Sequence, residues 1–297
     1  SHINYSIKYL YTLVNSGNLK EAFNYAKKLE KKKLDSFESH IIMGVVYLRN
    51  SEIDLAQEYF LKAKTSNARF ILNKYVSSSI YNWSDLDNHN LDKAIIKLEK
   101  LDERFGNLKN IQKVFLHCYF NSPNTNSLFK ELTSNKETDF SRYNYFYASY
   151  LATLGKTEKA KDTVKSALRS HPRNLLLNQY KIDLKEGKNT FNFNCKNKAN
   201  VVAEILYIAS NALSSQAIYP LSNFYLNLAK HLNKDFISYD TLLAENFYEI
   251  DDFDKAKKII VFALNLHPRN LLLNQYKIDL KENKNILIFD CKKSTDV

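Results

Sequence analysis

The strongest constraint in this sequence is a block of sixteen residues that occurs twice. HPRNLLLNQYKIDLKE covers residues 171–186 and again 267–282, which places the copies 96 residues apart (267 − 171). One catalytic site has no use for two copies, whereas an architecture of stacked modules does. Similar residues surround both copies at the same offset, so the duplicated unit extends roughly from Tyr147 to Lys196. The repetition therefore predicts an architecture rather than a site.

A finer spacing recurs inside and outside the duplicated unit. Small and large apolar residues alternate along one helical face and are followed in the duplicated unit by proline. The sets are Ala160, Val164, Ala167 and Pro172; Ala256, Ile260, Ala263 and Pro268; Ala56, Phe60 and Ala63; Ser222, Leu226 and Ala229; Ala22, Ala26 and Leu29. Two pairs of these sets are 34 residues apart (56 − 22 and 256 − 222). Such a period indicates paired helices that repeat.

The helices that precede these sets carry a matching pattern. Met43, Gly44 and Tyr47 place a small residue one turn before a large one, and Ala148 and Ala244 occupy the same small position. A small residue lets paired helices approach closely, and a large residue fills the space beside it. We expect Gly17 and Gly155 to end helices in the left-handed conformation. Asn174 and Asn270 are expected to cap the helices that follow.

This pattern resembles the tetratricopeptide repeat. The residues that carry the resemblance are Met43, Gly44, Tyr47, Ala56, Phe60, Ala63, Ala148, Ala160, Ala167, Pro172, Ala229, Ala244, Ala256, Ala263 and Pro268. The resemblance implies an all-α fold, a right-handed superhelical solenoid of six or seven stacked antiparallel helical hairpins. Residues 200–258 also look like exported repeat proteins of unknown role from alphaproteobacteria.

The spacing also predicts how the chain is organised. We expect an N-terminal array over 1–186, with degenerate repeats around 68–140, and an irregular loop over 187–199. Further helical pairs are expected over 200–297. Both copies of the block should form the same helix, and the second copy should cap the last pair.

Composition excludes several alternatives. Five glycines and four prolines are few for 297 residues, whereas sandwiches, barrels and nucleotide-binding α/β folds use many glycines in turns and phosphate loops. No apolar stretch approaches the ~18–20 residues of a membrane span. The sequence starts Ser-His-Ile without Met, so a removed signal peptide is compatible with it. Cytoplasm and periplasm both remain open.

The sequence carries no recognisable catalytic or metal-binding motif. Phosphate-binding loops, zinc-protease motifs and nucleophile elbows are all missing. The seven histidines have no metal-ligand spacing, and His171 and His267 precede prolines where a helix ends. We therefore expect no catalytic residue, metal or cofactor, although a catalytic domain outside this sequence is a third possibility.

The cysteines form no obvious framework. Cys118, Cys195 and Cys291 are odd in number and contain no C-x-x-C pair. Cys195 and Cys291 occupy equivalent positions in the duplicated unit. We expect free, buried thiols.

The resemblance implies a non-enzymatic scaffold that binds a peptide or helix of a partner protein in a concave groove lined by the first helices. Carried over by spacing, the groove candidates are Tyr11, Arg49, Arg142, Tyr145, Tyr207, Asn211, Tyr248 and Glu249. Aromatic residues and arginine are common anchors in interfaces. The alternative is that several of these tyrosines pack between repeats.

The net charge of +11 raises a second hypothesis, an RNA-binding helical repeat that uses a basic surface. The lysines are dispersed, however, as in chains encoded by AT-rich genomes. Helical repeats that read RNA carry recurring polar residues at equivalent positions. Here those positions vary from Ile41 to Tyr145 to Thr241, so no code is visible.

A repeat array predicts that damage stays partly local. We expect Ala256→Leu to push two helices apart, at a cost on the order of 1–3 kcal/mol. Amide hydrogen exchange should then accelerate in the C-terminal pairs while the helices near Ala56 keep their protection. Uniform loss of protection from Tyr5 to Lys284 would instead indicate one cooperative globule.

Overall fold

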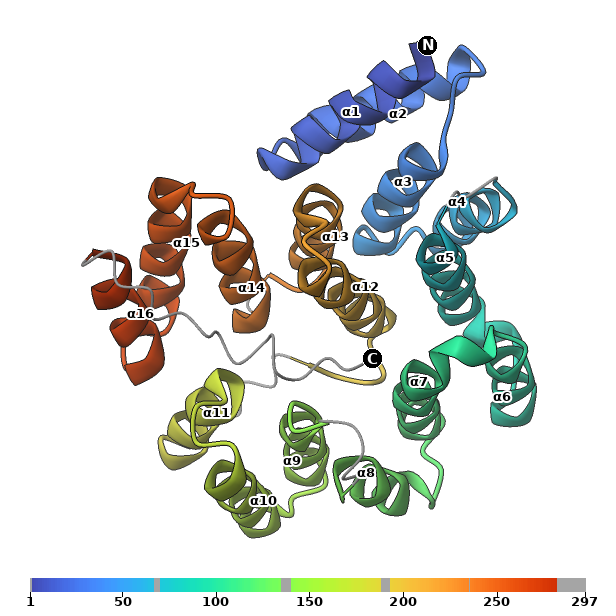
Figure 1. Ribbon diagram of the computed structural model, residues 1–297. Helices are drawn as coiled ribbons and strands as arrows, with labels where there is room; N and C mark the ends of the chain where they lie inside the picture. The colour runs from blue at the N-terminus through green and yellow to red at the C-terminus, as the bar shows by residue number, and fades with distance from the viewer. Residues whose placement is uncertain (1, 67–69, 135–139, 188–192, 235, 282–297) are drawn as a thin grey trace. The chain divides into compact units, whose positions relative to one another are not determined.

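The computed structural model describes residues 2–66, 70–134, 140–187, 193–234 and 236–281 of the chain (Figure 1). Within these ranges the regular structure is helical and contains no strand, which confirms the predicted all-α fold. None of the described helices is long and apolar enough to cross a membrane. The chain divides into two compact units, and each unit combines two separate stretches of sequence.

Unit 1 contains residues 1–120 and 195–234. Its helices are α1 (His2–Asn15), α2 (Leu19–Lys31), α3 (Phe37–Arg49), α4 (Ile53–Thr65), α5 (Ile71–Ser84), α6 (Leu91–Glu99), α7 (Gly106–Tyr119), α12 (Lys198–Ser215) and α13 (Tyr219–Leu232). Two short 3₁₀ helices, η1 (Leu86–Asn88) and η2 (Glu103–Phe105), flank α6. Consecutive helices from α1 to α7 pack against one another as antiparallel hairpins.

Close packing at small residues joins these hairpins, as the tetratricopeptide pattern predicts. Ala22, Ala26, Ala56 and Ala63 are fully buried. At Gly44 a Cβ atom would lie 2.4 Å from ring carbons of Phe60, itself fully buried on α4. The glycine therefore sets how closely α3 approaches α4.

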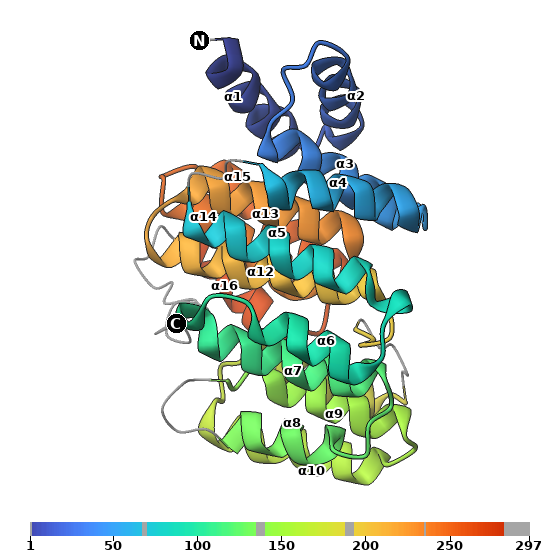
Figure 2. The same cartoon turned by 90° about the vertical axis from the view of Figure 1, so that its right-hand side faces the viewer.

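A hairpin from later in the sequence, α12–α13, completes unit 1. Helix α12 packs against α5, and α13 packs against α1 and α3 (Figure 2). Val201, Leu206, Phe224, Tyr225 and Leu228 of this hairpin are fully buried. Residues 200–232 thus lie with the N-terminal helices. The division of the sequence into an array over 1–186, a loop over 187–199 and further pairs over 200–297 stays a prediction.

The structure contradicts the predicted free thiols for two of the three cysteines. Cys118, near the end of α7, forms a disulfide with Cys195, which lies just before α12. The two are 77 residues apart in sequence, and only the return of the chain into unit 1 brings them together. The spacing of the cysteines in the sequence does not predict this disulfide. Cys291 lies outside the described residues.

Unit 2 contains residues 121–194 and 235–297. Its helices are α8 (Thr125–Ser134), α9 (Tyr143–Thr153), α10 (Thr157–Ser170), α11 (Leu175–Lys185), α14 (Ile237–Tyr248), α15 (Phe253–Leu266) and α16 (Leu271–Lys281). The pairs α9–α10 and α14–α15 form antiparallel hairpins, with Ala148, Ala160, Ala244 and Ala256 buried between their helices.

The two copies of the repeated block form the same helix, as predicted. Both α11 and α16 have the sequence LLLNQYKIDLK. The Asn174 side chain accepts a hydrogen bond from the amide of Leu177, and Asn270 accepts one from that of Leu273. Helix α16 packs against α15 as α11 packs against α10. Local sequence and the preceding hairpin together define this helix.

The two separate stretches of unit 2 also contact each other. Arg142 donates a hydrogen bond to the Ser238 hydroxyl, 2.7 Å away and 96 residues later. At the other end, the Asn270 side chain donates to the Gln179 side-chain oxygen at 3.2 Å. These hydrogen bonds join the two stretches of sequence that make up unit 2.

The contact between Gly44 and Phe60 generates a prediction. Ala is the better helix former by about 1 kcal/mol, but the added methyl would force the buried Phe60 ring to move. We expect Gly44→Ala to destabilise unit 1 by about 1–2 kcal/mol. The measurement is urea unfolding followed by fluorescence of Trp83, the single tryptophan, which is buried in unit 1.

Gly106→Ala is the matched control, because no atom lies within 4 Å of a Cβ built there. Its free energy of unfolding should stay within about 0.5 kcal/mol of that of the original protein. Equal midpoints for both variants would mean that Gly44 does not limit the approach of α3 to α4.

Candidate functional site

The first helices of the hairpins in unit 1 share a side that faces α12–α13. We call this side the inner face and define it by Tyr11 of α1, Glu38 of α3, and Asn73 and Ser84 of α5. It is the surface where the sequence predicted a peptide-binding groove. In the structure the chain's own hairpin occupies it.

An aromatic contact joins the inner face to α13. The ring of Tyr11 lies edge-on to Phe224, with centroids 4.9 Å apart and planes at 83°. The Tyr11 hydroxyl donates to the carboxylate of Glu38 at 3.0 Å. Burial, together with the neighbouring Glu38 charge, raises the pKa of Tyr11 well above its usual range. Tyr11 therefore donates from a neutral hydroxyl at ordinary pH.

A buried polar contact lies beside this aromatic pair. The hydroxyl of Tyr225 on α13 donates to the side-chain oxygen of Asn73 on α5 at 2.8 Å. Tyr225 is fully buried and Asn73 is 4% exposed. A buried amide oxygen left unpaired is costly, so this bond specifies how α13 sits on the inner face.

The start of α12 is held by an ion pair. The Lys198 ammonium lies 2.7 Å from the Asp87 carboxylate and donates to the Ser84 carbonyl at 3.2 Å. Tyr119, next to the disulfide-bonded Cys118, donates to the same carboxylate at 2.9 Å. The hydrogen bond from Lys198 is the main reason that the pKa of Asp87 falls below its usual value. Lys198 is only 9% exposed, so it depends on these partners.

Arg49 is the predicted groove residue that stays exposed in unit 1. It ends α3, and its charge acts on His231 near the end of α13. Burial, with the charges of Arg49 and Lys234, lowers the pKa of His231 to about 4. The Nε2 atom of His231 is buried and has no hydrogen-bond partner among the described residues.

Two predicted groove residues come together in unit 2. The Arg142 guanidinium lies over the rings of Phe236 and Phe146, at 5.0 and 5.5 Å from their centroids. Tyr145 packs against Phe236 and Tyr180 and is 2% exposed. Both residues therefore stabilise the contact between α9, α11 and the start of α14.

The other four candidates are not brought together. Tyr207 and Asn211 lie on α12 and are 4% and 7% exposed, so they belong to the hairpin that fills the inner face. Tyr248 packs edge-on against Phe253 at the turn between α14 and α15, and Glu249 beside it is exposed. The binding role of all eight residues stays a prediction.

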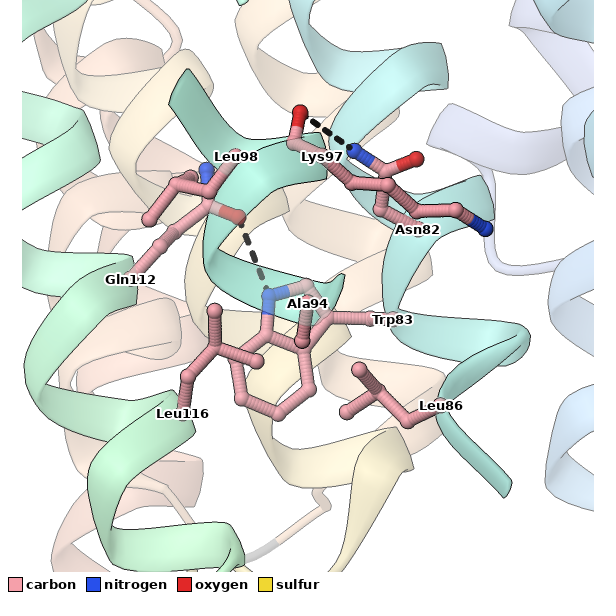
Figure 3. Close-up of a pocket in the computed structure, with 8 residues that line it drawn as sticks. All are labelled: Asn82, Trp83, Leu86, Ala94, Lys97, Leu98, Gln112 and Leu116. Carbon is pink, nitrogen blue, oxygen red and sulfur yellow. Dashed lines mark hydrogen bonds between the residues drawn. The ribbon is translucent and has the colours of Figure 1, made fainter. Parts of the chain in front are cut away.

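A small cavity lies between α5, α6 and α7 (Figure 3). Its volume of about 10 Å³ has room for about one water molecule. Trp83 donates to the Gln112 side-chain oxygen at 3.0 Å, and Gln112 donates in turn to Tyr75 and Ser79. This network satisfies buried polar groups of the core, and the cavity is too small for an organic ligand.

No group of three or more His, Cys, Asp or Glu residues able to hold a metal occurs among the described residues. Four residues that attach the hairpin were not predicted from the sequence: Lys198, Asp87, Phe224 and Tyr225. One signal was available, because the apolar residues of α13 spread over more than half of its circumference, a pattern typical of burial against more than one neighbour.

Comparison with solved structures finds other helical proteins. Two of the similar chains are the Cut9–Hcn1 hetero-tetramer of the APC/C (15% identity, TM-score 0.39) and the C-terminal part of a TPR repeat-containing protein from Cytophaga hutchinsonii (15% identity, TM-score 0.41). The match to the first covers 91% of this chain and 48% of that chain. The match to the second covers 90% of this chain and 98% of that chain. The TPR domain of P58(IPK) is also similar, with 13% identity, a TM-score of 0.27, and coverage of 92% of this chain and 86% of its own. No family model and no curated protein matches the sequence. The helical hairpins of this chain itself establish the all-α fold.

The environment of His231 generates a pH prediction. The pKa of His231 is about 4 in the folded protein and 6.5 in the unfolded chain. As the pH falls, the unfolded chain is therefore protonated at His231 near pH 6.5, and the folded chain only near pH 4. Its contribution to stability is therefore complete above pH 6.5 and declines as the pH falls towards 4.

We expect His231→Gln to lose less stability than the original protein between pH 6.5 and 4.5, by on the order of 1–2 kcal/mol after allowance for partial exposure. Urea unfolding followed by Trp83 fluorescence at each pH measures the difference. Other titrating groups affect both proteins alike, so parallel pH curves would show that His231 makes no such contribution.

Proposed function

We propose that this protein is a non-enzymatic scaffold that binds a helical or peptide segment of a partner protein through the inner face of unit 1. One observation carries the proposal. The inner face already binds a helical hairpin, α12–α13, by an aromatic contact at Tyr11, a hydrogen bond at Asn73 and an ion pair at Asp87.

These contacts define the chemistry that a partner segment would need. An aromatic ring fits edge-on against Tyr11, a hydroxyl donor satisfies Asn73, and an ammonium pairs with Asp87. All three can be carried by amphipathic helices, which commonly dock in hydrophobic grooves. Arg49, exposed at the end of α3, provides an accessible charge for an acidic side chain of the partner.

The proposal is tested by capturing partner proteins with the whole chain. Arg49→Glu reverses an exposed charge beside α13, so we expect folding to be unchanged and specific partners to be reduced at least fivefold. Quantitative mass spectrometry of proteins retained from an extract of cells that encode the chain measures this change.

Lys20→Glu, at an exposed position of the second helix α2, is the matched control because it introduces the same change of charge on a different helix. It should retain the partners at the original level. Partners that Arg49→Glu retains as well as the original would argue against a binding surface at this end of the inner face. Nuclease treatment of the extract distinguishes the RNA alternative, in which retention would depend on RNA.

A further inference from the structure

We infer that the Cys118–Cys195 disulfide holds α12–α13 on the inner face, so that its reduction makes this face available to a partner. The inference rests on the proposed function for the identity of the binding surface. The detachment of the hairpin, however, can be measured without any partner.

The hairpin and a partner segment would compete for the same residues. Tyr11, Asn73 and Ser84 are contacted by Phe224, Tyr225 and Lys198 of the hairpin. A second segment cannot use these groups while α12–α13 is in place, because two chains cannot fill one packed volume. Binding at the inner face therefore requires the hairpin to open away from α1, α3 and α5.

One set of attachments of the hairpin lies at the start of α12. The disulfide at Cys195 lies three residues before Lys198, which pairs with Asp87. Tyr119, which donates to Asp87, follows Cys118 directly. One covalent bond and one ion pair thus attach the same end of the hairpin to α7 and η1. After the loss of the covalent bond, the ion pair and the hydrogen bond from Lys198 to the Ser84 carbonyl still hold this end.

The course of the chain explains why the covalent bond matters. The chain leaves unit 1 after Phe120 and returns to it at Cys195. The disulfide therefore joins the end of the first stretch of unit 1 to the beginning of the second. It closes a loop of 77 residues. With the bond intact, the start of α12 stays beside the end of α7 even when the rest of the hairpin opens, and reduction removes this constraint.

The redox step has a simple balance. A dithiol supplies two electrons and two protons, the S–S bond breaks to give the thiols of Cys118 and Cys195, and the dithiol becomes a disulfide. Both cysteines are buried, at 5% and 8% exposed. Reduction therefore requires a local opening at the start of α12, which makes it slow compared with reduction of an exposed disulfide.

Hydrogen exchange on the whole chain tests the inference. All proteins carry Cys291→Ser, so that only the two disulfide-forming cysteines remain. We expect Cys118→Ser to accelerate amide exchange in α12 and α13 by roughly 30- to 1,000-fold. The second helices α2 and α4 should change less than about threefold, because the hairpin packs mainly against α1, α3 and α5.

Cys195→Ser should reproduce this pattern, and dithiothreitol should produce it in the protein that keeps both cysteines. The reductant arm also answers the question if either serine variant fails to fold. Unchanged exchange in α12–α13 would overturn the inference. An equal acceleration from α1 to α7 would overturn it too, because the disulfide would then stabilise unit 1 as a whole.

A peptide separates this inference from the proposed function. A fluorescent peptide of residues 219–232, the sequence of α13, should bind the reduced protein at least tenfold more tightly than the oxidised one. Equal binding to both forms would contradict control by the disulfide. Faster exchange without peptide binding would support the covalent attachment and count against the inner face as a site for a separate segment.

Discussion

A pair of antiparallel helices buries apolar residues between its members and leaves a further apolar side that another element must cover. Most of this structure follows from that requirement. In unit 1, α1 to α7 stack as hairpins through small residues such as Ala56 and Gly44, yet the inner face with Tyr11 and Asn73 remains to be covered. The chain covers it with α12–α13 rather than leaving it to water.

This solution changes the meaning of a groove residue. Tyr11 has the position and the chemistry of an anchor for a ligand, and it does hold an aromatic ring, that of Phe224. The ligand is part of the same chain. A role in stability and a role in recognition are therefore not alternatives for Tyr11, because the same contact can serve one and then the other.

Much of the local structure could be predicted from sequence because its causes are local. The small residues at Gly44 and Ala148, the caps at Asn174 and Asn270, and the 34-residue spacing all act within one or two hairpins. The identical helices α11 and α16 are the clearest case. Short-range packing and capping suffice to specify them.

The rest depends on contacts between distant parts of the chain, and periodicity carries no information on these. The disulfide joins Cys118 to a residue 77 positions later, and Tyr225 meets Asn73 across 152 positions. Tyr207 occupies a first-helix position yet is buried, because α12 itself fills the inner face. Of the predicted groove residues, Tyr11 and Arg49 lie on helices that the hairpin covers, whereas the return of α12–α13 to these helices could not be foreseen from the sequence.

The discontinuous make-up of unit 1 has a consequence for synthesis on the ribosome. Helix α5 ends at Ser84 and α13 ends at Leu232, so 148 further residues (232 − 84) must be polymerised before the inner face can be covered. At 5–20 residues per second this takes roughly 7–30 s. During that interval the inner face of every nascent chain is uncovered. The interval is long enough for a molecular chaperone to bind this face and release it many times.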